Sequence, residues 1–216
     1  MRSWRGFGSF SSRKNELAQI LLELVVSFTN HIMAIDRVQQ RLRRVTSALE
    51  VAGVAYAVVG GNAVAAWVGR VDQAATRSTK DVDLLVRRAD VDRISTVIEG
   101  LGFRRENLRD LVIFIDPDEP SKRSGVHLVW ADERIRPSYG EPSPKVEESE
   151  RDPEGFRVLA LAALVRMKLT SFRDIDRVHV GDLLEVGLVT GAVRDSLAPE
   201  LLQRLAQIEH DRSDES

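Results

Sequence analysis

The stretch Tyr56–Val86, YAVVGGNAVAAWVGRVDQAATRSTKDVDLLV, decides the fold. Its apolar start predicts a strand that is covered on both faces, and the pair Gly60–Gly61 ends this strand. A second apolar strand closes the stretch and carries Asp81 and Asp83. Side chains two positions apart on a strand point to the same face of a sheet, so we expect the two aspartates to project together.

These two carboxylates predict a metal site. Carboxylates held side by side repel each other, and one takes up a proton unless a cation lies between them. Mg²⁺, or Mn²⁺ in its place, binds a few carboxylate oxygens together with water and substrate phosphates. The alternative is that Asp81 only begins the strand and that Asp83 lies on a solvated edge.

The glycine pair predicts a phosphate site. Glycine lets the backbone approach a ligand closely, and the N-terminus of the helix that follows carries a positive partial charge that favours phosphate. The alternative is a tight turn that needs a positive φ. Phosphoryl and nucleotidyl transfer use a phosphate site next to a metal site, so the two motifs support each other.

The composition fits an ordinary globular protein. A chain of 216 residues suits one domain, or a small α/β domain with a helical appendage. The net charge of -2 argues against a general nucleic-acid coat protein but leaves room for a local basic rim. The sequence has no cysteine, which removes disulfides and thiolate zinc sites and fits a cytoplasmic protein.

The N-terminal region lies outside the domain that the pattern predicts. Residues 17–28, LAQILLELVVSF, are apolar, but they are too few to span a bilayer and include Glu23, so no membrane partner is expected. No signal-peptide cleavage site follows them. We expect the domain to begin at Met33, with residues 1–32 as a disordered or helical extension.

The remaining patterns predict an α+β fold, with a mixed sheet flanked by helices and followed by a helical subdomain. Asn62 is expected to cap the helix that ends before Gly69. The predicted elements are a helix at 35–52, strands at 54–59, 81–86, 110–116 and 125–131, and a helix starting near 89. The predicted divisions are an α/β domain at 33–135, a linker at 136–155, helices at 156–210 and a tail at 211–216.

The segment VVGGNAVAAWVGR…TRSTKDVDLLV resembles the nucleotidyltransferase fold of the DNA polymerase β superfamily. It is most similar to small bacterial members, namely abortive-infection, toxin-type and antibiotic nucleotidyltransferases. The resemblance covers Val54–Ala131 well and Leu161–Leu183 more weakly. It implies an α+β nucleotidyltransferase domain that takes an NTP and uses Mg²⁺ or Mn²⁺.

The resemblance also assigns roles to individual residues. Gly60 and Gly61 would bind the triphosphate, and Asp81 and Asp83 would hold the metals. Lys168 stands where toxin-type relatives place a phosphate-binding lysine. The residues that would complete the nucleotide pocket are Asn62, Arg77, Thr79 and Arg173.

One position departs from the family pattern. The family places a third carboxylate on a later strand, and the matching strand GVHLVWA has His127, which would serve as metal ligand or as general base. The alternative is that His127 is an ordinary half-exposed strand residue. The carboxylates that could substitute are Asp116, Asp132 and Glu133, while His179 and Asp182 are expected on a solvated face.

The predicted function is metal-dependent transfer of a nucleoside monophosphate from an NTP to a hydroxyl group. The acceptor would be an RNA such as tRNA, a protein or a small molecule, and an antitoxin is a further partner that the resemblance suggests. Two alternatives stay open. In the first, the chain is a catalytically degenerate nucleotide sensor or a toxin–antitoxin component. In the second, it is a plain α/β scaffold that does not bind nucleotides.

Overall fold

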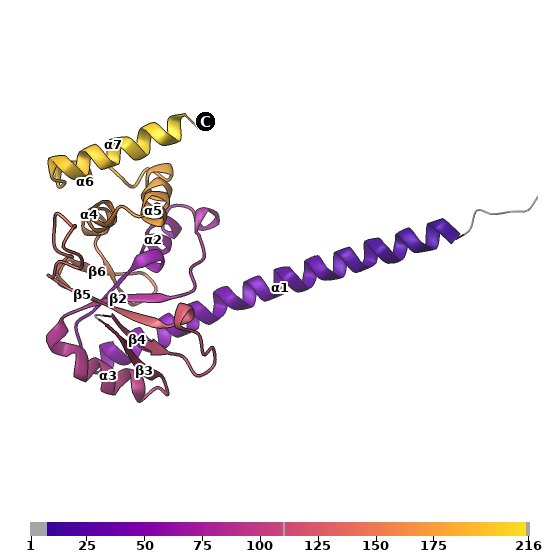
Figure 1. The fold of residues 1–216 in the computed structure, drawn as a ribbon, viewed down its shortest axis with the longest axis horizontal. Coiled ribbons are helices and arrows are strands. Elements are labelled where there is room, and N and C mark those ends of the chain that lie inside the picture. The colour runs from indigo at the N-terminus through magenta and orange to yellow at the C-terminus, as the bar shows by residue number, and fades with distance from the viewer. Residues whose placement is uncertain (1–7, 110, 215–216) are drawn as a thin grey trace, which may run out of the picture.

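The computed structural model describes residues 8–109 and 111–214, with side chains from Gln19 onward except that of His31 (Figure 1). Seven strands form one mixed sheet in the order β3-β4-β5-β2-β1-β7-β6. The strands are β1 (Ala57–Val59), β2 (Val82–Val86), β3 (Arg104–Leu108), β4 (Leu111–Ile115), β5 (Val126–Trp130), β6 (Ser149–Arg151) and β7 (Arg157–Leu159). The helices are α1 (Gly8–Val51), α2 (Gly60–Gly69), α3 (Val91–Glu99), α4 (Leu161–Ser171), α5 (Asp174–Glu185), α6 (Gly191–Asp195) and α7 (Pro199–Ser213).

Helices cover the sheet on both sides. Figure 1 shows α3 and the C-terminal part of α1 below the strands, and α2, α4 and α5 above them. The predicted α+β fold with a mixed sheet is confirmed. The core is continuous across the sheet, and side chains from α1, such as Leu42 and Leu49, are fully buried in it.

The central strands follow the sequence prediction closely. β2 lies between β1 and β5, antiparallel to the first and parallel to the second. Its apolar residues Val82, Leu84 and Leu85 are fully buried, as a strand covered by helices on both faces requires. This arrangement places the residue pair Asp81 and Asp83 at the N-terminal end of a central strand.

Two predicted helix starts are wrong. The helix α1 begins at Gly8 and not near Ile35, so of the two expectations for the N-terminal extension the helical one holds for residues 8–32. The helix α2 begins at Gly60 with Val59 as its N-cap, so Asn62 lies inside the first turn and is not the cap. Among the described residues, no helix is both long enough and apolar enough to span a membrane.

The expected helix from residue 156 is also wrong in its first turn. Arg157–Leu159 form β7, which pairs in parallel with β1 and antiparallel with β6. β6 itself lies in the segment 136–155 that was expected to be a linker. A short apolar run next to a helix has no periodicity of its own, and its pairing partner β1 lies about a hundred residues earlier in the chain.

Candidate functional site

The site is built where three neighbouring strands meet. Asp83 of β2 pairs with Val59 of β1 on one side and with His127 of β5 on the other. Gly60 follows Val59 directly, so the glycine turn, the aspartate and the histidine form a row across the sheet. The row joins segments of the chain that are widely separated in the sequence.

Asp81, Asp83 and His127 form what we call the acid cluster. Each offers one potential ligand atom, and these atoms all lie within 4.8 Å of one another. The Nδ1 atom of His127 lies 3.6 Å from Oδ2 of Asp81 and 3.4 Å from Oδ1 of Asp83. All three side chains are half-buried, so a ligand can reach them while bulk water screens them only partly.

The orientation of His127 is fixed by the backbone. Its Nε2 atom lies 2.8 Å from the carbonyl oxygen of Lys122. A carbonyl only accepts, so Nε2 carries a hydrogen. In the protonated ring Nδ1 donates to Asp83, and in the neutral ring the lone pair of Nδ1 would be available to a cation. Burial lowers the pKa of His127, but the hydrogen bond with Asp83, the Lys122 carbonyl and the nearby carboxylate charges outweigh it and raise that pKa above 6.5.

The acid cluster fits a divalent cation. Two carboxylates and a ring nitrogen with its lone pair face one another, and a backbone carbonyl holds the other ring nitrogen, as is usual for histidine ligands. Mg²⁺ favours oxygen ligands, whereas a nitrogen ligand binds first-row transition metals with an affinity that rises from Mn²⁺ onward. The two carboxylates suit Mg²⁺ or Mn²⁺, and the ring nitrogen is the donor that favours Mn²⁺ over Mg²⁺.

The glycine turn touches the acid cluster. Gly60 has a φ of +67°, and a Cβ atom placed on it would lie 2.0 Å from Oδ2 of Asp83. A Cβ on Gly61 would lie 3.0 Å from the side chain of Thr79. The N-terminus of α2, whose first amides have no acceptor within the helix, thus lies directly beside the carboxylates.

Two predicted nucleotide-binding residues contact Asp81. The hydroxyl of Thr79 donates to Oδ1 of Asp81 at 2.7 Å. The side-chain amide of the buried Asn62 donates to the backbone carbonyl of Asp81 at 2.6 Å. The bond from Asn62 fixes Asp81 relative to the start of α2, and the bond from Thr79 orients its carboxylate.

Arg77 lies in a different cluster. Its Nε donates to the two carboxylate oxygens of Asp182 at 2.9 and 2.7 Å. Asp182 is buried, so its expected place on a solvated face is wrong. The same expectation is wrong for His179, whose Nδ1 is buried with no hydrogen-bond partner among the described residues and whose pKa is lowered to about 4, mainly by burial.

Lys168 and Arg173 meet at the buried Asp176. The Nζ of Lys168 lies 3.0 Å from Oδ1 of Asp176, and the Nε of Arg173 lies 2.7 Å from Oδ2. Asp176 is desolvated, but Arg173, Lys168 and Ser171 outweigh that effect and lower its pKa to about 2. The pKa of Arg173 is raised by the hydrogen bond and charge of Asp176 first, and the charge of Asp83 acts in the same direction.

None of the proposed substitute carboxylates joins the acid cluster in the described part of the chain. Asp116 is bound by Arg41 at 3.0 Å, and Glu133 pairs with Arg88 at 2.6 Å. Asp132 stands just after β5 with a φ of +58°. The sequence contains no sign that Arg41 pairs with Asp116, because a lone arginine on a helix face does not indicate a buried partner in a distant turn.

Comparison with known proteins places the chain among nucleotidyltransferases. A family described as an uncharacterised nucleotidyltransferase matches residues 11–147. No curated protein matches the sequence. These results show a family and leave the acceptor undefined.

Three solved structures match this chain over most of its length. The resistance factor ANT(2'')-Ia in complex with adenylyl-2''-tobramycin has a TM-score of 0.50 and 18% identity, covering 82% of this chain and 99% of its own. Its solution structure has a TM-score of 0.49 and 17% identity, covering 84% and 95%. JHP933 from Helicobacter pylori has a TM-score of 0.45 and 16% identity, covering 84% and 75%.

Proposed function

Because the chain belongs to the uncharacterised nucleotidyltransferase family, we propose that this enzyme transfers a nucleoside monophosphate from an NTP to a hydroxyl group with a divalent cation. The observation that carries the proposal is the contact between the glycine turn and the acid cluster. A Cβ on Gly60 would overlap the carboxylate of Asp83. A phosphate held by the start of α2 would therefore lie within reach of a cation on the acid cluster.

The reaction forms one bond and breaks one. The acceptor oxygen forms a bond to the α-phosphorus, and the bond from that phosphorus to the oxygen bridging to the β-phosphate breaks. Pyrophosphate leaves with the electron pair, and the hydroxyl proton passes to water or to a carboxylate of the acid cluster. A bound divalent cation would polarise the phosphate and neutralise charge on the leaving group.

The residues of the acid cluster hold the cation in this proposal. Asp81 and Asp83 supply oxygen ligands and His127 supplies Nδ1. His127 fits the role of ligand better than that of general base, because Nε2 is bonded to Lys122 and Nδ1 faces the carboxylates. Thr79 orients Asp81 through its hydroxyl.

The triphosphate is expected between the glycine turn and the start of α5. The backbone at Gly60 and Gly61 leaves room for phosphate oxygens, and Arg173 would neutralise their charge. Lys168 is buried against Asp176, so we propose that it acts on the nucleotide through this pair and Arg173 rather than by direct contact.

The proposal is tested with labelled NTPs. The purified chain is incubated with each of the four nucleotides, total RNA, and Mg²⁺ or Mn²⁺. We expect label transfer that falls by roughly a thousandfold or more in Asp83→Asn, because one cation ligand is lost. Asp195→Asn, which removes an exposed carboxylate on α6, should leave transfer unchanged.

A nucleotide sensor is the second candidate. The observation that favours it is His127 in place of the family's third carboxylate. In that case a thermal shift with NTP and Mn²⁺ would appear without transfer to any acceptor. Absence of both transfer and a nucleotide-induced shift would contradict both functions.

A further inference from the structure

A groove lies along α1, beside the loop that leads into β2. One hollow of about 360 Å³ lies between α1, residues 78–80 and the turn at 119–124. A second hollow of about 500 Å³ lies between α1 and α2. Both are lined by Ile35, Val38, Ser78 and Thr79, so we name them together the α1 groove.

The groove leads to the site through Thr79. This residue lines both hollows, and its hydroxyl donates to Asp81. Lys80 lines the smaller hollow and directly precedes Asp81. Thr79 and Lys80 therefore connect the lining of the groove to Asp81.

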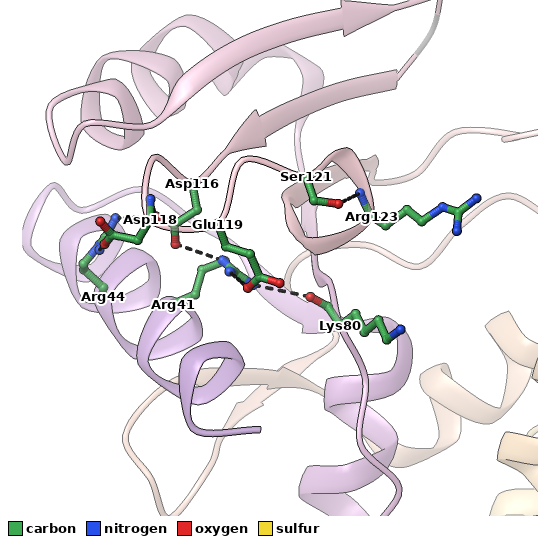
Figure 2. Close-up of polar contacts among 8 residues, drawn as sticks. All are labelled: Arg41, Arg44, Lys80, Asp116, Asp118, Glu119, Ser121 and Arg123. Atoms are coloured by element: carbon green, nitrogen blue, oxygen red, sulfur yellow. Dashed lines mark hydrogen bonds and ion pairs between the residues drawn. The ribbon is translucent and has the colours of Figure 1, made fainter. Parts of the chain in front are cut away.

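Carboxylates of the turn at 116–119 are already paired with arginines of α1, and the two that line the larger hollow, Asp152 and Glu154, pair with Arg70 and Arg43. Figure 2 shows Arg41 between Asp116 and Glu119, with hydrogen bonds of 3.0 and 2.8 Å to them. Arg44 supports the same turn, at 3.4 Å from Asp116 and 3.5 Å from Asp118. Arg41 also donates to the carbonyl oxygen of Lys80 at 3.3 Å, which fixes the backbone that enters β2.

Lys80 and Arg123 remain free to bind an anion. Both side chains are exposed, and in the described part of the chain neither forms an ion pair. In Figure 2 the two side chains extend in the same direction, away from Arg41. Arg37 adds positive charge nearby, since its charge acts on Glu119.

The two cationic groups lie on different flanks of the central strand. The turn that carries Arg123 leads into β5, whereas Lys168 belongs to α4 and Arg173 precedes α5, two helices that pack with α2, which follows β1. β2 lies between β1 and β5. If the triphosphate binds Arg173, the side chains of Lys80 and Arg123 in the α1 groove are available to bind the acceptor.

Resting on the proposed transfer reaction, we propose that the acceptor is an RNA whose phosphates contact Lys80 and Arg123 in the α1 groove while its terminal ribose hydroxyl reaches the acid cluster. An unpaired basic rim suits a phosphate backbone and repels a polycationic acceptor such as an aminoglycoside. The groove extends over two adjoining hollows, which suits a chain of nucleotides better than a compact molecule. Contacts to phosphates alone imply weak dependence on base sequence and strong dependence on salt.

The first experiment measures RNA affinity of the full chain. A labelled 20-nucleotide RNA of mixed sequence is titrated by fluorescence anisotropy between 50 and 200 mM KCl. In the double variant Lys80→Met/Arg123→Met we expect roughly tenfold weaker binding and a log–log salt slope smaller by about 2, one for each lost phosphate contact. The matched control Lys145→Met removes an exposed lysine that does not line the groove and should bind as the unmodified chain does.

The second experiment measures transfer with the same RNA. The double variant should bind ATP with unchanged affinity but lose transfer to RNA, and periodate-oxidised RNA, which lacks the terminal diol, should not be labelled. If an aminoglycoside or a protein is labelled in place of RNA, and this labelling requires Asp83, the RNA proposal is overturned. The proposed function is then still supported. RNA affinity that is indifferent to Lys80 and Arg123 would overturn the groove assignment.

Failure of the proposed function gives a different result. In that case no acceptor is labelled, but the anisotropy series still reports whether RNA binding depends on the α1 groove. RNA binding that depends on Lys80 and Arg123 would then support the groove without the reaction. Loss of folding is checked by urea unfolding of each variant, which should match the parent chain because both side chains are exposed.

Discussion

At the scale of the residue, Gly60 is the position of the site that tolerates a side chain least. Its φ of +67° suits glycine, and a Cβ there would lie 2.0 Å from Asp83 Oδ2. We predict that Gly60→Ala lowers transfer by roughly a hundredfold or more through displacement of the carboxylate. Strain at positive φ should cost about 1 kcal/mol of unfolding free energy, measured by urea titration.

Gly191→Ala is the matched control for this substitution. A Cβ on Gly191 meets no atom within 4 Å, so both transfer and stability should stay close to those of the parent chain. Full transfer by Gly60→Ala would mean that the contact with Asp83 has no role in the reaction.

His127 sets the metal preference of the acid cluster. Replacing its ring nitrogen with a carboxylate oxygen makes the donor set more suitable for Mg²⁺. We predict that His127→Asp raises the ratio of Mg²⁺-supported to Mn²⁺-supported transfer by about tenfold. Titration calorimetry without nucleotide should show the same change in the two binding constants.

The exposed His210 on α7 provides the control for this exchange. His210→Asp adds the same carboxylate far from the sheet strands that carry the acid cluster, so the metal preference should not change. An unchanged ratio in His127→Asp would show that this side chain does not ligate the cation.

At the scale of the element, the burial of His179 on α5 makes the fold sensitive to acid. Burial lowers its pKa to about 4, and the charge of Lys168 acts in the same direction. An unfolded chain binds this proton near pH 6.5, so stability falls as the pH drops from 6.5 to 4. The difference of about 2.5 pH units corresponds to about 3 kcal/mol at most.

We predict that His179→Gln removes this part of the pH dependence. Urea unfolding at pH 7, 5.5 and 4.5 should show a shallower loss of stability in the variant than in the parent chain. His210→Gln, at an exposed position, should follow the parent. Parallel curves for all three proteins would show that His179 accepts its proton in the folded state.

The same scale shows which elements the sequence could predict. β2 and the glycine turn have local signals, an apolar run with two aspartates and a Gly-Gly pair, and both were predicted close to their bounds. β3 has the polar sequence RRENL, whose side chains are mostly exposed, and it forms because β4 pairs with it. A strand of this kind depends on its partner and not on its own pattern.

Contacts between distant residues were the part that the sequence could not predict. Asp182 is buried because Arg77, 105 positions away, pairs with it. Asp116 appeared to be a spare carboxylate, but Arg41 binds it from 75 positions away. Residue type and spacing therefore identified the acid cluster, whereas only the fold separated catalytic candidates from residues with structural partners.

At the scale of the whole molecule, α1 consists of two parts with different surroundings. Figure 1 shows its N-terminal part extending away from the body of the protein. Among the described side chains of α1, the first buried apolar one is Val38, whereas large apolar side chains before it, such as Leu22 and Phe28, are exposed. The contribution of α1 to stability should therefore come from residues 35–51.

We predict that a chain beginning at Met33 has the same free energy of unfolding as the full chain within about 0.5 kcal/mol, because residues 19–32 bury no described side chain in the core. It should also self-associate less, since it lacks the exposed apolar segment. Urea unfolding and light scattering test these two statements. Leu42→Ala in the shortened chain is the positive control and should cost about 2–5 kcal/mol, because Leu42 is fully buried. A loss above about 1 kcal/mol on shortening would mean that the N-terminal part of α1 packs on the body in solution.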